Sequence, residues 1–346
     1  MANEELKKFV VLEHQTIKEA LQVINDNWRE VALVEDEKGR IVGVITDGDI
    51  RRGILRGLTL DSPAVEVMTR KYISVGPEED RAAVLDIMKA LGVRHVPIID
   101  RKKRLIGIHF LQELIGKVSK PNIAVIMAGG KGIRLRPLTE YCPKPMIPVA
   151  GRPILERLVL QLVGHGIQQI YISINYLGNM IEEHFGDGSS FGCTIEYLRE
   201  KEALGTGGSL ALLPERLEHP LIVMNGDLVT QVNITKLLDF HEQEHVEATI
   251  VSRPYQVEIP FGVITKEGNR LVQIQEKPPA NYLINAGVYV LNPVVLKLIP
   301  RDREFPITNL FDLLLKKKSL VGVYMLQEEW IDIGRHDELH KANGIV

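Results

Sequence analysis

Apolar and polar positions follow two different rhythms along the chain. In the first third, apolar residues at helical spacing (17–24 and 82–91) are each followed by a short apolar run and a charged turn. From Ile123 onward, apolar runs of strand length alternate with amphipathic helical segments, as at 123–127, 154–165 and 170–174. This alternation predicts a mostly parallel sheet wrapped by helices, with ligands at the carboxyl ends of its strands.

Beyond residue 248 the rhythm changes to short β-rich runs, which we expect to add a mixed or antiparallel part to that sheet. The runs are 249–253, 262–265, 271–275 and 286–291.

The first third of the chain is an internal repeat with an offset of 64 residues. Residues 31–36 align with residues 95–100, and Asp49 aligns with Glu113. A unit of about 60 residues with a half-buried sheet is too small to stand alone easily, so the two copies should pack on each other. We predict a first domain at 1–118, a linker at 119–122 marked by a proline, and a second domain at 123–346.

Composition limits the classes of protein to which this chain can belong. The 346 residues suffice for about two domains, and the formal net charge of −3 argues against a nucleic-acid binder. Cys142 and Cys193 lack the spacing of a metal site, which favours a reducing compartment. The N-terminal segment has no apolar signal core and no run is long enough to span a membrane, so we expect a cytoplasmic protein.

A glycine-rich turn at 128–139 follows the apolar run that begins the second domain. Glycines let backbone N–H groups close on an anion, and arginine adds a planar, permanently charged fork. The candidate phosphate contacts are Ala128, Gly129, Gly130, Gly132, Arg134 and, less specifically, Arg136. Lys144 follows, held between two prolines.

Together, these two segments resemble the signature of the sugar-1-phosphate nucleotidyltransferases. The resemblance covers residues 122–346, with all motifs in the expected order. It implies an α/β, Rossmann-like (GT-A-like) domain that forms a nucleotide-sugar and pyrophosphate from a nucleoside triphosphate and a sugar 1-phosphate. Arg134 would then hold the triphosphate and Lys144 the reacting phosphate, as the catalytic pair.

Two aspartates are candidate metal ligands. Asp227 closes a strand, and Asp332 lies in a separate segment after Trp330. Mg²⁺ is usually bound by hard carboxylates together with substrate phosphates and waters. In the family resemblance, these positions match the two metal-binding aspartates, which makes Mg²⁺ the expected cofactor.

The resemblance also assigns substrate contacts. Glu200 and Gly205 match the base and ribose region of the nucleotide site. Glu276 and Lys277 match the pair that contacts sugar hydroxyls and sugar phosphate, and Gly262 and Asn285 match further sugar contacts.

The repeated first third resembles a pair of cystathionine-β-synthase-type (CBS) repeats, a tandem Bateman module of α+β type. Thr46 and Asp49 have the spacing that adenosyl-binding repeats use for ribose hydroxyls, and Arg51 or Arg52 could reach phosphates. The second repeat has Phe110 and Glu113 instead. We therefore expect at most one adenine-nucleotide site, near Thr46. The alternative is a module that only dimerises the chain, and we expect a homodimer or higher homo-oligomer.

The combined pattern resembles CBS-linked guanylyltransferases that act on glucosamine 1-phosphate or mannose 1-phosphate in bacterial glycan precursor pathways. Uridylyl, thymidylyl or cytidylyl transfer stays open, as does a non-catalytic nucleotide sensor. A third class, a zinc hydrolase, would use His241 and His245, which have metalloprotease spacing. No third zinc ligand stands out, so we expect these histidines to be structural.

Overall fold

The computed structural model describes residues 6–116, 119–301 and 303–344. The chain divides into two compact units, at Met1–Lys117 and Val118–Val346, and each is described by itself. No helix among the described residues is both long enough and apolar enough to cross a membrane.

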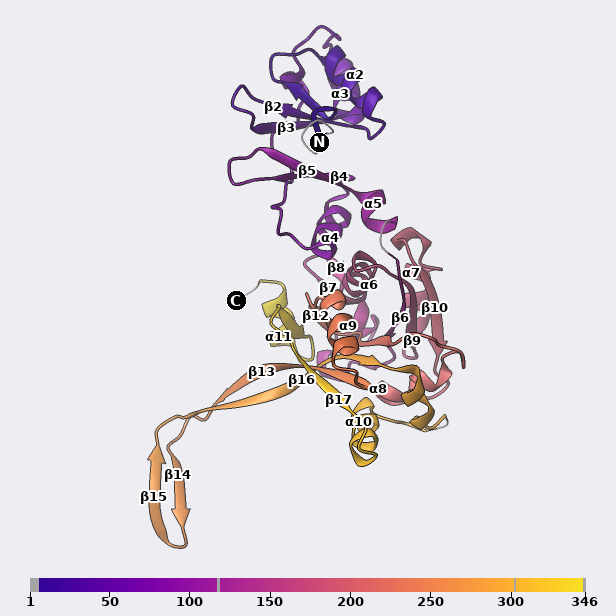
Figure 1. Cartoon of the computed structure of the whole chain (residues 1–346), viewed down its shortest axis with the longest axis vertical. Helices are drawn as coiled ribbons and strands as arrows, with labels where there is room; N and C mark the ends of the chain where they lie inside the picture. The colour runs from indigo at the N-terminus through magenta and orange to yellow at the C-terminus, as the bar shows by residue number, and fades with distance from the viewer. Residues whose placement is uncertain (1–5, 117–118, 302, 345–346) are drawn as a thin grey trace. The chain divides into compact units, whose positions relative to one another are not determined.

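The first unit contains two copies of one α+β motif (Figure 1). In the first copy β1 pairs in parallel with β2, which pairs antiparallel with β3, and in the second copy β4 pairs antiparallel with β5. Its elements are β1 (Val10–Leu12), α2 (Ile17–Asn27), β2 (Val31–Glu35), β3 (Ile41–Thr46), α3 (Asp47–Leu55), η1 (Ala64–Glu66), α4 (Arg81–Leu91), β4 (His95–Ile99), β5 (Leu105–Phe110) and α5 (Leu111–Gly116).

The two copies agree at the level of single hydrogen bonds. In the β2–β3 turn, Asp36 Oδ1 accepts from the backbone N–H groups of Lys38 and Arg40, both at 2.9 Å. In the β4–β5 turn, Asp100 Oδ1 accepts from Lys102 and Arg104 at 2.8 and 2.9 Å. These turns are 64 residues apart, as the repeat predicts.

The sheets of the two copies share an apolar core, because each exposes a face that it cannot bury alone. Val31, Leu33 and Ile41 are fully or almost fully buried against side chains of β5, among them Leu105 and Phe110. A second core lies under the first copy, where Ile17, Ala20 and Ile24 face inward from α2 at helical spacing.

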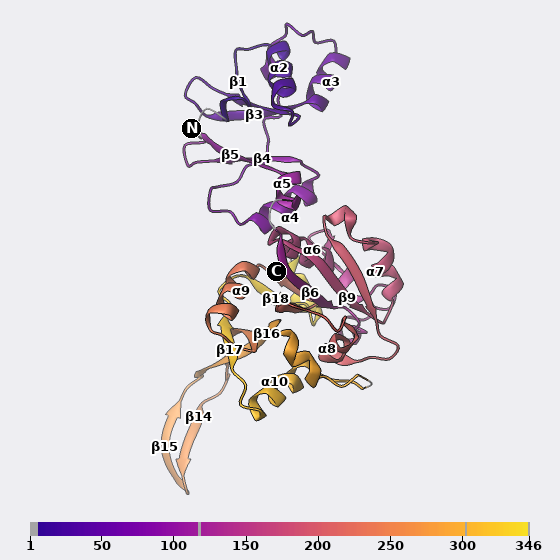
Figure 2. The same cartoon turned by 45° about the vertical axis from the view of Figure 1, so that its right-hand side comes forward.

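The second unit is built on a seven-stranded sheet in the order β10-β9-β6-β11-β16-β13-β17 (Figures 1 and 2). Its strands are β6 (Lys120–Met127), β9 (Ile167–Ile174), β10 (Thr194–Arg199), β11 (Leu221–Asn225), β13 (Ala248–Glu258), β16 (Pro279–Leu291) and β17 (Val321–Met325). The first four are mutually parallel, and β16 pairs antiparallel with β11 and β13. The expected α/β fold with a mixed sheet is confirmed. Residues 120–122, which we placed in a linker, begin β6 instead.

Helices pack around this sheet. One core cluster joins Val125 and Val223 of the central strands to Leu310 and Leu314 of α10. The helices are α6 (Ile154–Gly164), α7 (Gly178–Phe185), α8 (Gly205–Gly208), α9 (Ile234–Gln243), α10 (Ile307–Lys316) and α11 (His336–Ala342). Short 3₁₀ turns connect them: η2 (Ile133–Leu135), η3 (Lys144–Met146), η4 (Ser189–Phe191), η5 (Ser209–Leu212) and η6 (Pro293–Leu298).

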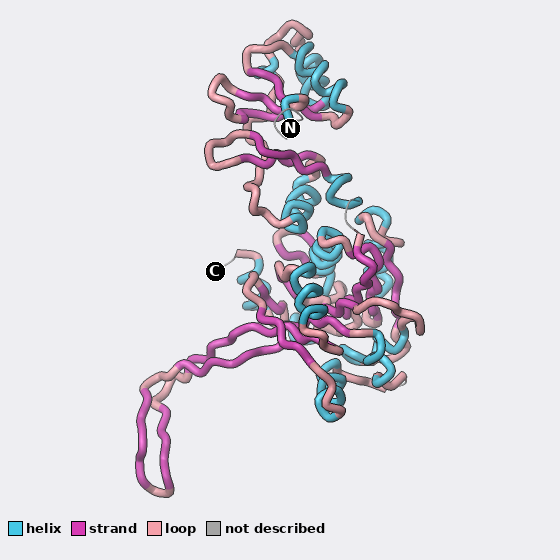
Figure 3. The backbone as a smooth tube through the Cα atoms, in the orientation of Figure 1, coloured by secondary structure: helices cyan, strands magenta, loops and turns pink. Residues whose placement is uncertain are grey.

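A two-stranded arm continues from β13 and β16 beyond the sheet (Figure 3). It leads to the hairpin of β14 (Val263–Glu267) and β15 (Arg270–Gln275). Every residue of β15 is exposed. The sequence predicted short separate runs here, whereas the structure has strands of 11 and 13 residues in β13 and β16.

Candidate functional site

The glycine-rich turn rests directly on the lysine segment. Gly132 has φ +59°, and a Cβ at this position would lie 2.9 Å from both Lys144 Cβ and Thr139 Cγ2. The buried Thr139 hydroxyl donates to the Gly132 carbonyl at 2.8 Å. Only glycine therefore allows the turn to approach Lys144 this closely. Gly130, in contrast, has open space where a Cβ would lie.

A short antiparallel pair brings the two predicted metal ligands together. β12 (Leu228–Thr230) pairs with β18 (Trp330–Asp332), with Leu228 opposite Asp332. The N–H of Ile333 donates to the Asp227 carbonyl at 3.0 Å. Gly226 lies against β6, because a Cβ there would be 2.6 Å from the Met127 carbonyl oxygen.

Lys144 joins the two carboxylates. Its Nζ forms an ion pair with Asp227 Oδ2 and lies 3.9 Å from Asp332 Oδ1. The lysine side chain is only 11% exposed. Arg134 belongs to the same group, since a Cβ on Gly334 would lie 3.6 Å from its Cζ.

The electrostatics of this cluster favour the binding of a cation. Burial, together with the neighbouring Asp227 carboxylate, raises the pKa of Asp332 to about 6 against the opposing effect of Lys144. Two close carboxylates in a partly buried site favour the arrival of another positive charge.

Three buried oxygens at this site lack hydrogen-bond partners among the described residues: Asn225 Oδ1, Asp227 Oδ1 and Asp332 Oδ1. Buried acceptors are normally satisfied, so unpartnered carboxylate and amide oxygens fit a hard divalent cation. No group of three or more His, Cys, Asp or Glu able to hold a metal occurs in the described part of the chain. This donor set thus suits an ion that takes its remaining ligands from substrate and water. Asn225 was not among the residues predicted from the sequence, although it lies at the end of β11, two residues before Asp227.

Hydrogen bonds hold the side chain of Glu200 at the same edge of the sheet. Its carboxylate accepts from the Ser173 hydroxyl and, at 2.8 Å, from the N–H of Leu204. A Cβ on Gly129 would lie 3.0 Å from Glu200 Oε1. Glu200 therefore connects the glycine-rich turn to the segment that begins α8, and Gly205, with φ +73°, lies next to that contact.

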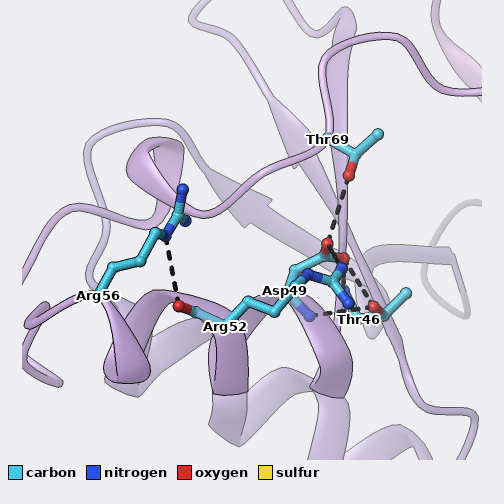
Figure 4. A network of polar contacts seen from close by, with 5 residues as sticks. All are labelled: Thr46, Asp49, Arg52, Arg56 and Thr69. Atoms are coloured by element: carbon cyan, nitrogen blue, oxygen red, sulfur yellow. Dashed lines mark hydrogen bonds and ion pairs between the residues drawn. The ribbon is translucent and has the colours of Figure 1, made fainter.

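In the first unit, Thr46 and Asp49 form the capping box at the start of α3. Asp49 Oδ2 accepts from the Thr46 hydroxyl at 2.6 Å and from its N–H at 2.9 Å. Arg52 forms an ion pair with Asp49 Oδ1, and the Thr69 hydroxyl is 3.4 Å from the same oxygen (Figure 4). These residues line a cavity of about 480 Å³, which Arg51 does not line.

At the position that the repeat relates to this pocket, protein side chains contact one another. Arg29 donates to Glu113 Oε1 at 2.8 Å and its guanidinium lies 4.7 Å from the centre of the Phe110 ring. Phe110 and Glu113 stand where the first copy has Thr46 and Asp49.

Comparison with known proteins identifies both units. Residues 123–346 match the nucleotidyl transferase family, and residues 5–56 and 64–108 match CBS domains. The chain belongs to the nucleotidyl transferase family. This confirms the family resemblance and the pair of CBS repeats.

Individual relatives are similar to the second unit of this chain. A mannose-1-phosphate guanylyltransferase of Mycobacterium tuberculosis is 36% identical over 227 residues, which is 64% of this chain and 63% of the relative. A UTP–glucose-1-phosphate uridylyltransferase of Synechocystis is 32% identical, over 63% of this chain and 62% of the relative. The chain thus spans less than two thirds of these relatives. The crystal structure of HddC from Yersinia pseudotuberculosis superimposes with a TM-score of 0.52 at 26% identity, covering 64% of this chain and 98% of HddC.

Of the predicted sugar contacts, the structure places Gly262, Glu276 and Lys277 on the arm. Glu276 and Lys277 are exposed and lie between β15 and β16. A Cβ on Gly262 would lie 3.1 Å from Glu276 Oε2. Asn285, at the base of the arm, donates to the Tyr289 hydroxyl at 2.7 Å. Among the described residues, neither Glu276 nor Lys277 forms an ion pair with the Lys144 cluster.

His241 of this nucleotidyl transferase is structural. Its Nδ1 lies 2.8 Å from the Thr249 hydroxyl and its Nε2 lies 3.2 Å from Asn292 Oδ1. Burial lowers the pKa of the imidazole. Because both ring nitrogens are already engaged, the arrangement gives no support to the zinc hydrolase alternative.

Proposed function

We propose that this chain transfers a nucleotidyl group from a nucleoside triphosphate to a sugar 1-phosphate and releases pyrophosphate, with GTP as the favoured donor. The observation that carries the proposal is the meeting of the glycine-rich turn, Lys144 and the Asp227–Asp332 pair at the carboxyl edge of β6 and β11. The guanine preference rests on the guanylyltransferase relative. UTP is the alternative donor, because a uridylyltransferase also matches.

In the proposed reaction, a phosphate oxygen of the sugar 1-phosphate attacks the α-phosphorus of the donor. A new phosphorus–oxygen bond forms, the bond from the α-phosphorus to the oxygen bridging to the β-phosphorus breaks, and pyrophosphate leaves with that oxygen. Such displacements depend on positioning and on stabilisation of the developing charge. Lys144 would hold the α-phosphate or the attacking phosphate as a point charge, and Arg134 would hold the departing pyrophosphate.

Asp227 and Asp332 would hold a Mg²⁺ ion, because each has a buried oxygen without a hydrogen-bond partner. When bound, the ion supplies positive charge that orients and neutralises the reacting phosphates. The backbone N–H groups of the glycine-rich turn would cover the triphosphate. This turn includes the predicted contacts Ala128, Gly129, Gly130 and Gly132.

The remaining substrate contacts are part of the same proposal. Glu200 and Gly205 would shape the base and ribose site from the segment next to the glycine-rich turn. Gly262, Glu276 and Lys277 of the arm and Asn285 at its base would contact the sugar.

The CBS unit would bind an adenine or other nucleotide at Thr46 and Asp49 and regulate the enzyme, which we expect to be a cytoplasmic homodimer or higher homo-oligomer. The cavity of about 480 Å³ at these residues supports a ligand site. Arg51 or Arg52 would contact the phosphates, and of the two only Arg52 lines this cavity.

The test is pyrophosphate release from four nucleoside triphosphates against a panel of hexose and hexosamine 1-phosphates, with and without Mg²⁺. We expect one strong pair that requires the metal and contains GTP. A strong pair with UTP would select the alternative donor. Silence across the panel, with and without added adenine nucleotides, would favour a non-catalytic nucleotide sensor and overturn the transferase proposal.

A further inference from the structure

The two outer strands of the seven-stranded sheet expose different kinds of side chain. At one edge, β10 exposes the charged residues Glu196 and Arg199, whereas β17 at the other edge exposes Val323 and Met325. Charged side chains on an edge strand discourage pairing with a further strand. Residues 319–326, which contain β17, include no charged residue. One edge of the sheet is therefore protected against a new strand, and the other is not.

The backbone of β17 has one side toward β13 and one side open. The Leu320 carbonyl accepts from the N–H of Glu247 at 2.9 Å. At the other end of the strand, the N–H of Leu326 donates to the Ser252 carbonyl at 2.8 Å. Because successive residues of a strand direct their polar groups to opposite sides, the three odd-numbered residues of β17 direct theirs away from β13. In the described part of the chain only β13 pairs with β17, so these outward groups can pair with a further strand.

Both faces of β17 also carry apolar surface beside this open edge. On one face Val321 packs on the core cluster that contains α10, and Val323 is 50% exposed. On the other face the ring of Tyr324 lies 5.4 Å from that of Phe240 in α9, measured between centroids. A hollow of about 320 Å³ lies between α9 and the end of β17. Figures 1 and 2 show both helices beside β17. A strand added here would therefore bury apolar side chains as well as pair backbone groups.

Opposite charges flank the two ends of β17. Lys317 and Lys318 precede the strand and are exposed. Glu328 and Glu329 follow it, the first partly exposed and the second exposed. If two copies of β17 paired in parallel, like charges would meet at both ends. In antiparallel pairing, each basic end meets the acidic end of the partner, which favours the antiparallel arrangement.

A two-fold axis at Val323 is the register that uses all of these features. Val323 then faces the partner's Val323, and Val321 faces the partner's Met325. Because these residues have outward N–H and C=O groups, each facing pair can exchange two backbone hydrogen bonds. Leu320, which is 64% exposed, would lie opposite the partner's Leu326, on the face that has the hollow. A surface that complements itself in this way suits an isologous dimer.

We propose that β17 is a contact surface for a second copy of this chain, and that two β17 strands pair antiparallel about Val323 so that the sheet continues from one copy into the other. The proposal gives the expected homo-oligomer a defined surface and is independent of the proposed reaction. Because the paired strands are short, the contact belongs to the small class of interfaces, and we expect an association that depends on protein concentration in the micromolar range.

Disulfide trapping of the full chain tests the register, in a background with Cys142→Ser and Cys193→Ser. Chains carrying Val321→Cys and chains carrying Met325→Cys are mixed under mild oxidation, and intact dimers are identified by mass spectrometry. Facing Cα atoms about 5.5 Å apart suit a disulfide. We expect at least tenfold more of the mixed dimer than of either self-linked dimer, and Val323→Cys should link to itself. A mixed dimer at no more than twice either self-linked dimer, the ratio for random contact, would overturn the register.

A charge at the two-fold axis tests the contact itself. Val323→Lys should reduce the number of copies in the assembly by half or more, as measured by sedimentation velocity of the full chain, whether or not the CBS unit adds another contact. The matched control is Val294→Lys, at a valine of η6 that is 56% exposed, which should leave the assembly unchanged. An assembly of unchanged size in Val323→Lys, or an unmodified chain that is monomeric at every concentration, would overturn the proposal.

Charge reversal tests the antiparallel arrangement independently. Lys317→Glu combined with Lys318→Glu should weaken self-association at least tenfold, and so should Glu328→Lys combined with Glu329→Lys, because like charges then meet. A chain with all four changes has complementary ends again and should associate within about threefold of the unmodified chain. If the chain with four changes associated no better than the two double variants, the antiparallel pairing would be wrong.

Discussion

The two units each contain a cation–carboxylate pair at their candidate ligand site, but the two cations differ in how they are held. The side chain of Lys144 is 11% exposed and lies between two aspartates, whereas that of Arg52 is 66% exposed and pairs with a single aspartate, Asp49. A buried ammonium cannot leave its carboxylate without a large desolvation penalty, while an exposed guanidinium can. We infer that the charge of Lys144 is fixed in place, whereas the side chain of Arg52 is free to change partner.

The largest effect should follow from removing charge at the metal site. Asp227→Asn keeps the shape of the side chain but removes one of the two negative charges expected to hold Mg²⁺. We expect pyrophosphate release to fall by about a thousandfold or more while the chain remains folded, as judged by circular dichroism. Asp239→Asn, an exposed acid on α9, is the matched control and should leave the rate unchanged. Full Mg²⁺-dependent activity in Asp227→Asn would show that Asp227 is not a metal ligand.

Lys144→Met should affect both rate and stability, because it leaves two carboxylates without their shared counter-charge. We expect kcat/KM to fall by about a hundredfold or more and the free energy of unfolding to fall by about 2–4 kcal/mol in metal-free buffer. Urea unfolding measures the second effect. Lys236→Met, an exposed lysine, should change neither quantity. A stability equal to that of the unmodified chain would mean that Lys144 is as exchangeable as Arg52.

Arg29 is an intermediate case, with a side chain 37% exposed and two partners in the second repeat. Arg29→Val should lower the free energy of unfolding of the CBS unit by about 1 kcal/mol, through loss of the Glu113 ion pair and the contact with Phe110. Arg94→Val is the matched control, because Arg94 also pairs with a glutamate of the other repeat but is 73% exposed and lies 3.4 Å from Glu30. Equal melting temperatures for both variants would show that the contacts of Arg29 with Glu113 and Phe110 do not stabilise the second repeat.

The sequence predicted the parts of this comparison that depend on local pattern. Alternating apolar strands and helices identified the parallel sheet, and Asp227 was recognisable at the end of its strand. The 64-residue offset predicted that Asp36 and Asp100 make matching turns, because each turn is determined by residues within five positions of one another.

Contacts between residues far apart in the sequence could not be predicted from local pattern. Lys144 meets an aspartate 83 positions away, and Arg29 meets Glu113 across 84 positions. The pairing of β12 with β18 involves only three residues in each strand, too few for a recognisable alternation. The runs at 262–265 and 271–275 anticipated β14 and β15, but the length of β13 and β16 was not predicted, because their outer residues are mostly exposed and no buried face marks them.

The smallest effect concerns the turn carboxylates, Asp36 and Asp100, where the cations are largely exposed. Hydrogen bonds from the Arg40 side chain and backbone lower the pKa of Asp36, and those from Arg104 lower the pKa of Asp100, led by its backbone N–H. Because each pKa is lower in the folded chain, the stabilisation is complete above the unfolded value of about 4 and disappears as pH falls through the folded value. Melting temperatures of Asp36→Asn and Asp100→Asn should therefore lie below that of the unmodified chain at pH 7 and approach it below about pH 4. The two turns share no partner, so the double variant should show the sum of the single effects. A temperature gap that stayed constant down to pH 2.5 would mean that the carboxylate charge contributes nothing to either turn.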